Sequence, residues 1–387
     1  MFSSRLPSRL EPNAFSRLLA AARASGAPLI DLTETNPTVV GLTYPGGLLA
    51  GLADPGALRY DPAPLGSAPA REAVAAAHAA GVTADRVCLT ASTSEAYSLI
   101  FRLLCDAGDE VLVPRPSYPL FDLLTRLDAV QPVPYRLDLH GGWCLDRRGI
   151  EAGISTRTRA ILVVSPNNPT GSRLHDDDRE WLVGVAAARG VAIIADEVFA
   201  AYPLQPATPA RSLAGESRAL VFTLGGLSKS AGLPQLKLAW IVVSGPGPVV
   251  GPAMARLEII ADTYLSVSTP VQRAAASLIE AGASIRRQIA ERLTSNLQVL
   301  RTIVAREPSL TLLEPEGGWS VVLRLPATRP EEEWVMRLIT EAAVVAHPGY
   351  FFDFDEEAFL VLSLLPEAGL FADGASRIAR LVATIAA

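Results

Sequence analysis

The stretch RAILVVSPNNPTG, residues 159–171, indicates the fold class of this 387-residue chain. Its first half is apolar at consecutive positions, which is typical of a strand buried on both faces of a parallel sheet. Similar short runs recur between about residues 70 and 245, and they read VCLT, EVLVP, VAIIADEVF, ALVFTL and LAWIVVS. Segments of helical period separate most of these runs. The alternation predicts an α/β fold with a mostly parallel central sheet sandwiched by helices.

A second, smaller domain is expected towards the C-terminus, because the chain is long for a single core. From about residue 270 a long helical stretch leads into short strands and helices, which is typical of an α+β domain. We expect an N-terminal segment over residues 1–45 that packs with the small domain. A large domain is expected over residues 46–275, and the small domain over residues 276–387.

The composition excludes several classes of partner. Hydrophobic residues make up 49% of the chain and charged residues 19%, which indicates a well-packed globular protein. The net charge of -6 and the lack of a basic tract argue against nucleic acid. No apolar run is long enough for a membrane span or a signal peptide, so a cytoplasmic protein is expected. The spacing of the cysteines and histidines predicts neither a metal site nor a disulfide framework; the cysteines are Cys88, Cys105 and Cys144.

The loops that follow the apolar runs are the candidate sites, because ligands of such folds bind beyond the C-terminal ends of the strands. After VCLT, the residues Ser92, Thr93 and Ser94 open a helix whose free N–H groups suit a phosphate. From the residues alone, helix capping is the simpler interpretation.

Three further strand ends carry unusual residues. The turn NNPTG, residues 167–171, holds two asparagines at a strand tip. Asp196 ends an apolar strand, where its carboxylate is either a buried acceptor or the partner of a protonated ring nitrogen. Lys229 lies in a Gly/Ser loop beside apolar runs, where a lowered pKa favours imine formation, and Lys237 is a second cation nearby. For either lysine alone, a solvated surface position is the alternative.

Taken in order, the Ser/Thr loop, NNPTG, Asp196 and the Lys229 loop resemble the fold type I pyridoxal-phosphate-dependent aminotransferases of class I/II. The resemblance runs from about Asp31 to the C-terminal strand. It implies an aspartate aminotransferase-like fold with pyridoxal 5′-phosphate as the cofactor. It also implies ping-pong transfer of an amino group between an amine or amino acid donor and a 2-oxo acid or other carbonyl, in a homodimer.

The matching motifs carry residue roles over from that family. The segment GLSK makes Lys229 the imine lysine and proton shuttle, and Ser228 beside it is expected to contact the cofactor. Asn168 matches the asparagine that binds the phenolic oxygen, and Asp196 matches the carboxylate that keeps the pyridine nitrogen protonated. Tyr118 in PRPSYP matches the aromatic residue that stacks on the ring, although a core tyrosine would look the same.

The phosphate of the cofactor has its own set of matching residues. Ser92, Thr93 and Ser94 match the family's phosphate-binding helix start. Lys237 falls where an arginine is usual, which keeps the charge but loses the bidentate fork. Tyr60 in LRYDPAPLG matches the tyrosine that family members lend to the neighbouring subunit's site.

Two departures from the family's pattern concern the cofactor. Phe199 stands where a tyrosine is usual, which removes a hydrogen bond to the phenolic oxygen and is expected to raise the pKa of the imine. Gly226 stands where a serine is usual, so one phosphate contact is missing and backbone amides are expected to contribute more.

The third departure concerns the substrate. In the C-terminal strand FLVLSLL, Val361 stands where the family usually has the arginine that binds the substrate α-carboxylate. Either another cation takes this role, or the substrate presents a different group. The candidate cations are Arg5, Arg9, Arg115 and His347, although ordinary solvation is the simpler interpretation for each arginine. The loop HPGYFFDF resembles the family's substrate-facing loop, and its aromatic residues predict a partly apolar pocket.

Alternative functions stay open at this point. The departure at Val361 allows a lyase, decarboxylase or oxidase with the same cofactor. The run GPGPVVG prompts a nucleotide-dependent oxidoreductase, but Pro246 and Pro248 remove two N–H donors that a pyrophosphate needs. A non-catalytic binding or regulatory module is the third alternative, and the complete set of motifs argues against it.

Overall fold

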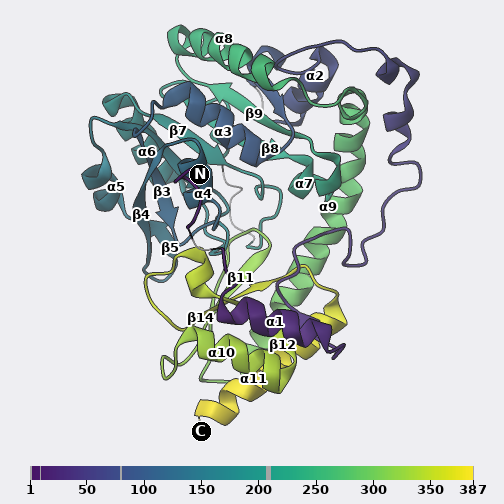
Figure 1. Ribbon diagram of the computed structural model, residues 1–387, viewed down its shortest axis with the longest axis vertical. Helices are drawn as coiled ribbons and strands as arrows, with labels where there is room; N and C mark the ends of the chain where they lie inside the picture. The colour runs from purple at the N-terminus through teal and green to yellow at the C-terminus, as the bar shows by residue number, and fades with distance from the viewer. Residues whose placement is uncertain (1, 9, 79–80, 206–210, 387) are drawn as a thin grey trace.

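The computed structural model describes residues 2–8, 10–78, 81–205 and 211–386 and contains a central eight-stranded sheet (Figure 1). The strand order is β2-β9-β8-β7-β6-β3-β4-β5. Pairing is parallel from β8 through β4, whereas β9 and β5 run antiparallel to their neighbours. The strands are β2 Val87–Thr90, β3 Glu110–Arg115, β4 Gln131–Leu139, β5 Trp143–Leu145, β6 Thr158–Val164, β7 Ala192–Asp196, β8 Val221–Gly226 and β9 Ala239–Ser244. The predicted α/β fold with a mostly parallel sheet is confirmed.

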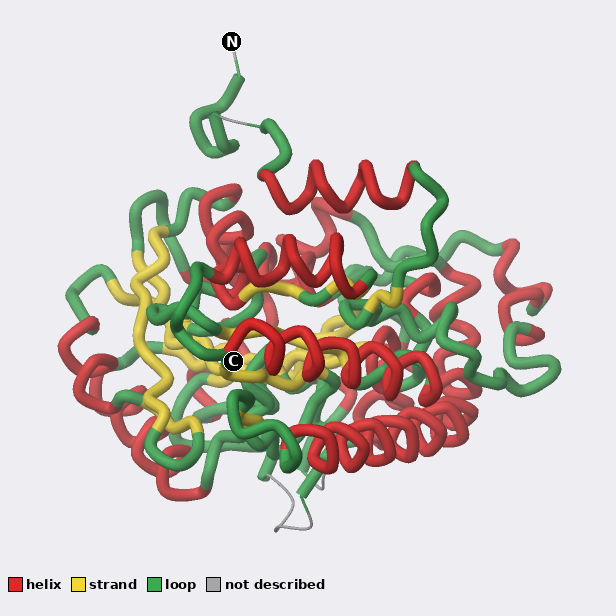
Figure 2. The backbone as a smooth tube through the Cα atoms, turned by 90° about the horizontal axis from the view of Figure 1, so that it is seen from below, coloured by secondary structure: helices red, strands yellow, loops and turns green. Residues whose placement is uncertain are grey.

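Helices cover both faces of this sheet, which explains why its strands are apolar at consecutive positions (Figure 2). Along β3, Val111 and Val113 pack with α3, α4 and α8, whereas Leu112 packs with α5 and α6 on the other face. The helices of this region are α2 Ala68–Ala77, α3 Thr93–Leu104, α4 Phe121–Leu127, α5 Arg147–Gly153, α6 Asp176–Arg189, α7 Leu227–Ser230 and α8 Gly247–Tyr264. Shorter helical turns are η1 Ala50–Ala53, η2 Pro55–Leu58, η3 Ala84–Arg86 and η4 Pro234–Leu236.

The strand β4 was not among the runs expected from the sequence. It contains Pro132 and Pro134, which pair in register with Val111 and Val113 of β3. Proline lacks an N–H donor and is therefore tolerated in a strand only where no partner needs it. Strand β5 pairs with β4 only from residue 137 onwards, so the prolines lie along an otherwise open edge.

A second sheet, of order β10-β11-β14-β13, lies at the other end of the molecule with the C-terminal helices (Figure 1). The N-terminal strand β1 joins this region because it pairs in parallel with β12, with Ile30 opposite Val344. The elements here are α1 Ala14–Ala24, β1 Ile30–Asp31, β10 Thr311–Leu313, β11 Ser320–Arg324, α10 Glu331–Arg337, η5 Leu338–Ala342, β12 Val344–Val345, β13 His347–Pro348, η6 Gly349–Phe352, β14 Phe359–Ser363 and α11 Ala368–Ala386.

The long helix α9, Thr269–Val304, connects the two regions (Figure 1). Its first turns pack with α2 in one core cluster, and the residues from Ile285 onwards pack with α11 in another. The boundary expected at residue 275 therefore lies inside a continuous helix, and the division into domains stays a prediction. Among the described residues, no helix combines the length and the apolar composition needed to cross a bilayer.

Candidate active site

Lys229 lies in the one-turn helix α7, directly after β8. Its Nζ is 4.5 Å from the centroid of the Trp319 ring and 5.5 Å from that of Phe199. The hydroxyl of Tyr202 donates a hydrogen bond of 2.5 Å to the Lys229 carbonyl oxygen. A side chain at Gly225 would place its Cβ 2.5 Å from Nε1 of Trp240, so the chain enters α7 through a position that only glycine fits. The amine is thus held in an aromatic pocket between the two regions of the molecule.

Burial lowers the pKa of Lys229 to about 8, although the carboxylate of Asp196 opposes this change. A buried ammonium loses its hydration, and the neighbouring anion restores only part of that loss. In a fraction of the protein molecules the Lys229 amine is therefore neutral near physiological pH. A neutral amine is the form that attacks a carbonyl carbon.

Asp196 ends β7 and is almost completely buried. The hydroxyl of Tyr97 donates to its Oδ2 at 2.6 Å, and the N–H of Val198 donates to its Oδ1 at 3.2 Å. Burial raises the pKa of this carboxyl despite those two donors and Lys229. The same carboxylate contributes, after burial, to the raised pKa of Tyr118. Asp196, Lys229 and Tyr118 therefore belong to one electrostatic site.

The NNPTG turn brings the two sheets together. Nδ2 of Asn167 donates to Oγ of Ser117 at 3.0 Å, and its Oδ1 accepts from Thr170 inside the turn. Oδ1 of Asn168 accepts from Oγ of Ser320, on β11, at 3.2 Å. Among the described residues none accepts from Nδ2 of Asn168. One asparagine thus stabilises the turn, while the other keeps a donor free.

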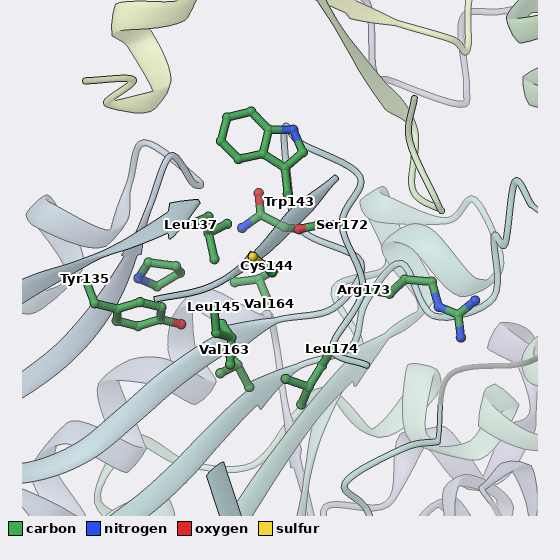
Figure 3. A pocket seen from close by; sticks show the side chains of 12 residues that line it. Tyr135, Leu137, Trp143, Cys144, Leu145, Val163, Val164, Ser172, Arg173 and Leu174 are labelled. Carbon is green, nitrogen blue, oxygen red and sulfur yellow. The ribbon is translucent and has the colours of Figure 1, made fainter. Parts of the chain in front are cut away.

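A small cavity lies beside this turn, lined by residues of β3, β4, β5 and β6 (Figure 3). Its volume is about 20 Å³, and its wall includes Tyr135, Trp143, Val163 and Asn167. A space of this size holds roughly one water molecule. It is too small for a cofactor or a substrate.

The start of α3 is closed by a reciprocal cap. Oγ of Ser92 accepts from the N–H of Glu95 at 3.1 Å, and the Glu95 carboxylate accepts from the N–H of Ala91. The capping interpretation of Ser92 is therefore confirmed. The N–H groups of Thr93 and Ser94 have no partner among the described residues and stay available as donors. Beside them lies a cavity of about 290 Å³ whose wall includes Ala91, Glu95 and the exposed Lys237.

The family described as aminotransferase class I and II matches residues 50–368, which include every strand of the central sheet. The chain belongs to this family. The resemblance seen in the sequence is therefore confirmed, and the chain is an aminotransferase.

Curated relatives and solved structures resemble this aminotransferase along most of its length. Glutamate-pyruvate aminotransferase AlaA of Haemophilus influenzae is 25% identical over 308 residues, which cover 78% of this chain and 76% of that one. Alanine aminotransferase of Mycobacterium tuberculosis is 26% identical over 291 residues, which cover 73% and 67%. The structure of alanine aminotransferase from Pyrococcus furiosus superposes with a TM-score of 0.89 at 23% identity, covering 99% of each chain. A Thermus thermophilus aspartate aminotransferase mutant gives 0.83 at 23% identity, covering 98% and 99%. These two structures show that the fold is shared.

Aminotransferases of this family depend on pyridoxal phosphate, and the residues present fit it. The free N–H groups of Thr93 and Ser94 suit the phosphate. The buried carboxylate of Asp196 suits a protonated ring nitrogen, and the buried amine of Lys229 suits a covalent bond to an aldehyde carbon. The free donor of Asn168 suits an anionic oxygen on the ring. No group of the described site opposes this fit except the Glu95 carboxylate, which is already bonded to the backbone.

Two of the residues expected in the site do not contact this group of side chains. Tyr60 is 73% exposed and lies in the segment that follows η2. Ser228 is partly buried next to Lys229, and among the described residues its side chain has no hydrogen-bond partner. Gly226 has little room for the serine usual at its position, because a Cβ there would lie 3.0 Å from that of Ala239.

The four cations considered for a substrate carboxylate differ in position. Arg5 is exposed, and its Nη1 donates to the carbonyl of Leu127. Arg9 lies outside the described residues. Nε of Arg115 is 3.6 Å from Oδ2 of Asp353, so its charge is already paired. His347 lies on β13, opposite Val361 of β14.

Four site residues were not found from the sequence. Tyr97 binds Asp196, Tyr202 binds the Lys229 carbonyl, Trp319 faces the Lys229 amine, and Ser320 binds Asn168. Tyr97 lies one helical turn after the Ser/Thr loop, so the helical period was a usable signal. The contacts of Tyr202, Trp319 and Ser320 depend on tertiary packing and leave no local pattern.

Replacing Lys229 by methionine is expected to stabilise the cofactor-free aminotransferase by about 3 kcal/mol at pH 7, because burial lowers the lysine pKa from about 10.5 to about 8. Between these pH values the unfolded chain binds more protons than the folded one, so wild-type stability rises with pH. The gain in folding stability of Lys229→Met over the wild type should therefore reach its full value below about pH 8 and vanish above about pH 10.5. Urea unfolding of both proteins across this range measures it.

The matched control is Lys237→Met, because the chain contains only these two lysines and Lys237 is exposed. This control should differ from the wild type by less than about 0.5 kcal/mol at every pH. A stability difference for Lys229→Met that does not change with pH would contradict the proposed cost of burial.

Replacing Phe199 by tyrosine is expected to lower the pKa of the lysine–cofactor bond by about one pH unit or more, since a hydrogen bond to a charged group contributes about 1.5–3 kcal/mol. Phe199 is buried, and its ring lies 5.6 Å from that of Trp319, so a hydroxyl fits only if it finds a partner at the site. Spectral titration of the holoenzyme measures the midpoint. Phe199→Leu is the control without a hydroxyl, and an unchanged midpoint in Phe199→Tyr would refute the idea.

Proposed function

We propose that Lys229 binds pyridoxal phosphate covalently through Nζ and shuttles the proton during amine transfer. The observation that carries this proposal is a buried amine, with a pKa of about 8, beside the buried carboxylate of Asp196. With its Nζ released, Lys229 would remove the proton from the amine-bearing carbon of the substrate. Bound pyridoxal phosphate supplies the electron sink for the pair left on that carbon.

Three side chains hold the ring in this proposal. Asp196, kept in place by Tyr97, holds the proton on the pyridine nitrogen. Asn168 donates its free Nδ2 to the phenolic oxygen. Tyr118 lies against the ring, and its own contact with Phe121, 5.6 Å between centroids, limits its rotation.

The phosphate is held at the start of α3. The N–H groups of Thr93 and Ser94 and the positive end of the helix dipole provide the donors, while Ser92 keeps the helix end in position. Lys237 supplies a positive charge on the wall of the same cavity. The hydroxyl of Ser228, which has no partner among the described residues, is the remaining donor.

Amino acids and 2-oxo acids are the first substrates to test, because the relatives are named alanine and glutamate-pyruvate aminotransferases. The experiment is a visible spectrum of the holoenzyme during addition of single donors. A donor that converts the cofactor to pyridoxamine phosphate, followed by reversal with a carbonyl acceptor, supports ping-pong transfer. A donor that is consumed while the cofactor stays in its aldehyde form indicates a lyase, decarboxylase or oxidase instead.

We further propose a cytoplasmic homodimer in which Tyr60 reaches the neighbouring site. Free thiols at all three cysteines suit a reducing compartment. Tyr60 and Leu58 are 73% and 92% exposed, and Tyr264 and Leu265 are 52% and 68% exposed. Tyr264 and Leu265 line the cavity beside the start of α3, and Arg59 and Asp61, on either side of Tyr60, line a second cavity. Such an exposed apolar surface next to a site is typical of a subunit interface.

Mixing two inactive variants tests this arrangement. In a hybrid of Lys229→Ala and Tyr60→Ala subunits, one site contains both defects and the other contains neither. Random exchange should therefore restore about a quarter of the wild-type activity if subunits of a two-fold dimer share their sites. Activity that stays at the sum of the two variants would show that Tyr60 acts within its own subunit or not at all.

A further inference from the structure

An apolar wall, made of Val322, Phe352, Phe359 and Val361, borders the candidate active site on the side of the second sheet. Two hydrogen bonds connect the second sheet with the candidate active site. Ser320, on the same strand as Val322, donates to Asn168. The N–H of Ser117, next to Tyr118, donates to the carbonyl of Phe352 at 3.0 Å.

The register of the sheet places the wall close to the Asn168 contact. Ser320 is opposite Ser363, and the next pair on the same face is Val322 opposite Val361. Two residues along a strand correspond to about 7 Å. The reacting carbon of a substrate lies near Lys229. A substituent of this carbon that points towards the second sheet would therefore contact the wall.

The wall is closed as well as apolar. None of its four side chains is more than 6% exposed. The Phe359 ring packs on that of Phe354 with 4.7 Å between centroids, and the outer sides of both residues line a separate cavity of about 320 Å³. A carboxylate on this side would need to displace well-packed side chains and lose its hydration.

The charged groups around the wall offer no free cation among the described residues. Nε of Arg115 lies 3.6 Å from Asp353, and Nη2 of Arg324 lies 3.4 Å from Glu356. Arg324 belongs to the next residue pair along β11, about 14 Å from Ser320 by strand geometry. The guanidinium of Arg324 lies 5.8 Å from the centroid of the Phe359 ring, so it reaches the wall, but its charge and that of Arg115 are already paired with carboxylates.

His347 is the remaining candidate, because it is opposite Val361 in the register of β13 and β14. Burial lowers the pKa of this imidazole, although the Asp31 carboxylate opposes the change. Rings of Phe351 and Phe352 lie 5.6 and 5.9 Å from it. Burial therefore favours the neutral form of His347, which supplies no charge for an anion.

We propose that the preferred amino donor is a primary amine that carries no carboxylate on its amine-bearing carbon, so that its product is an aldehyde or ketone. This inference depends on the proposed function. In the first half-reaction the donor carbon is oxidised by two electrons and its C–N bond is exchanged for a carbonyl whose oxygen comes from water. The nitrogen and the two electrons remain with the cofactor until a carbonyl acceptor takes them up.

Matched donor pairs test the proposal on the wild-type holoenzyme. L-valine is compared with isobutylamine, and L-phenylalanine with 2-phenylethylamine, so that each pair differs only by the carboxylate. The rate of pyridoxamine phosphate formation should give the amine a kcat/KM at least about tenfold higher, because an unpaired buried charge is costly. An amino acid that reacts as well as its amine would overturn the proposal, while leaving the aminotransferase function intact.

A pair of variants tests the wall itself. Phe352→Ala opens space beside Val361, and the double variant Phe352→Ala with Val361→Arg adds a cation to the same space. Relative to the single variant, the double variant should gain at least about tenfold in preference for the amino acid of each pair. An unchanged preference in two folded variants, verified by thermal unfolding, would overturn the placement of this wall against the substrate.

Ligand binding gives a readout that does not depend on turnover. The wild-type holoenzyme is titrated calorimetrically with 3-phenylpropanoate and with 3-phenylpropan-1-ol. Weaker binding of the carboxylate is expected, and tighter binding of the carboxylate would overturn the inference even if the variants fail to fold. Conversion of no donor at all would refute the proposed function, and the binding comparison would then decide the inference separately.

Discussion

Replacing Lys229 by alanine is expected to reduce amine transfer by about 10⁴-fold or more, because in the proposed function the residue is both the covalent anchor and the proton carrier. Its amine lies 4.5 Å from the Trp319 ring centroid and next to Asp196, in a position that no other lysine occupies. The visible band near about 400 nm that indicates a lysine–cofactor bond should disappear.

Chemical trapping makes this result specific. Borohydride reduction of the wild-type holoenzyme should add the cofactor to Lys229 and not to Lys237, the only other lysine of the chain. Lys229→Arg keeps a positive charge but should lose the band, since a guanidinium does not form this bond. A band of wild-type intensity in Lys229→Ala, or label on Lys237, would show that the covalent role is assigned to the wrong residue.

Replacing Asp196 by asparagine is expected to lower kcat/KM by about 30- to 5,000-fold, which corresponds to about 2–5 kcal/mol for removing one partner of a buried charge pair. The carboxylate is buried, and it accepts from Tyr97 and from the backbone of Val198. An amide of the same shape keeps the packing but does not hold a proton on the ring nitrogen. Steady-state kinetics and cofactor affinity measure the change.

A stability measurement separates this role from a structural one. Burial raises the pKa of Asp196, so its charged form is unfavourable in the folded protein without cofactor. Ionisation of Asp196 has no effect on stability below the pKa of this carboxyl in the unfolded chain. As the pH rises above that pKa, ionisation destabilises the folded protein. Asp196→Asn should therefore leave the cofactor-free protein at least as stable at pH 7. A large loss of stability together with the loss of activity would indicate a structural role, and Tyr97→Phe should show a smaller kinetic effect.

The candidate active site depends on contacts between two parts of the chain that are distant in sequence. Asn168 meets Ser320 across 152 positions, and Ser117 meets Phe352 through the backbone. Arg115 and Asp353 add an ion pair beside these contacts. Movement of the second sheet would therefore change the site itself, not only the access to it.

The central sheet was predictable because its strands are short apolar runs between amphipathic helices, and VAIIAD and RAILVV form β7 and β6 as expected. Strand β4 was not predictable in this way, since its prolines contradict the usual strand signal and only the open edge makes them acceptable. The boundary placed at residue 275 relied on a change in composition, whereas α9 continues through it because its apolar stripe packs on both regions.

The sequence by itself determined the family, the fold and the residues at strand ends, because glycines, prolines and polar side chains after apolar runs carry local signals. Only the tertiary structure decided how burial changes Lys229, which rings face it, and that Tyr97 holds Asp196. It also decided that Val361 belongs to a closed apolar wall. These properties depend on side chains brought together from distant positions, and neither burial nor desolvation is encoded in any one stretch of the chain.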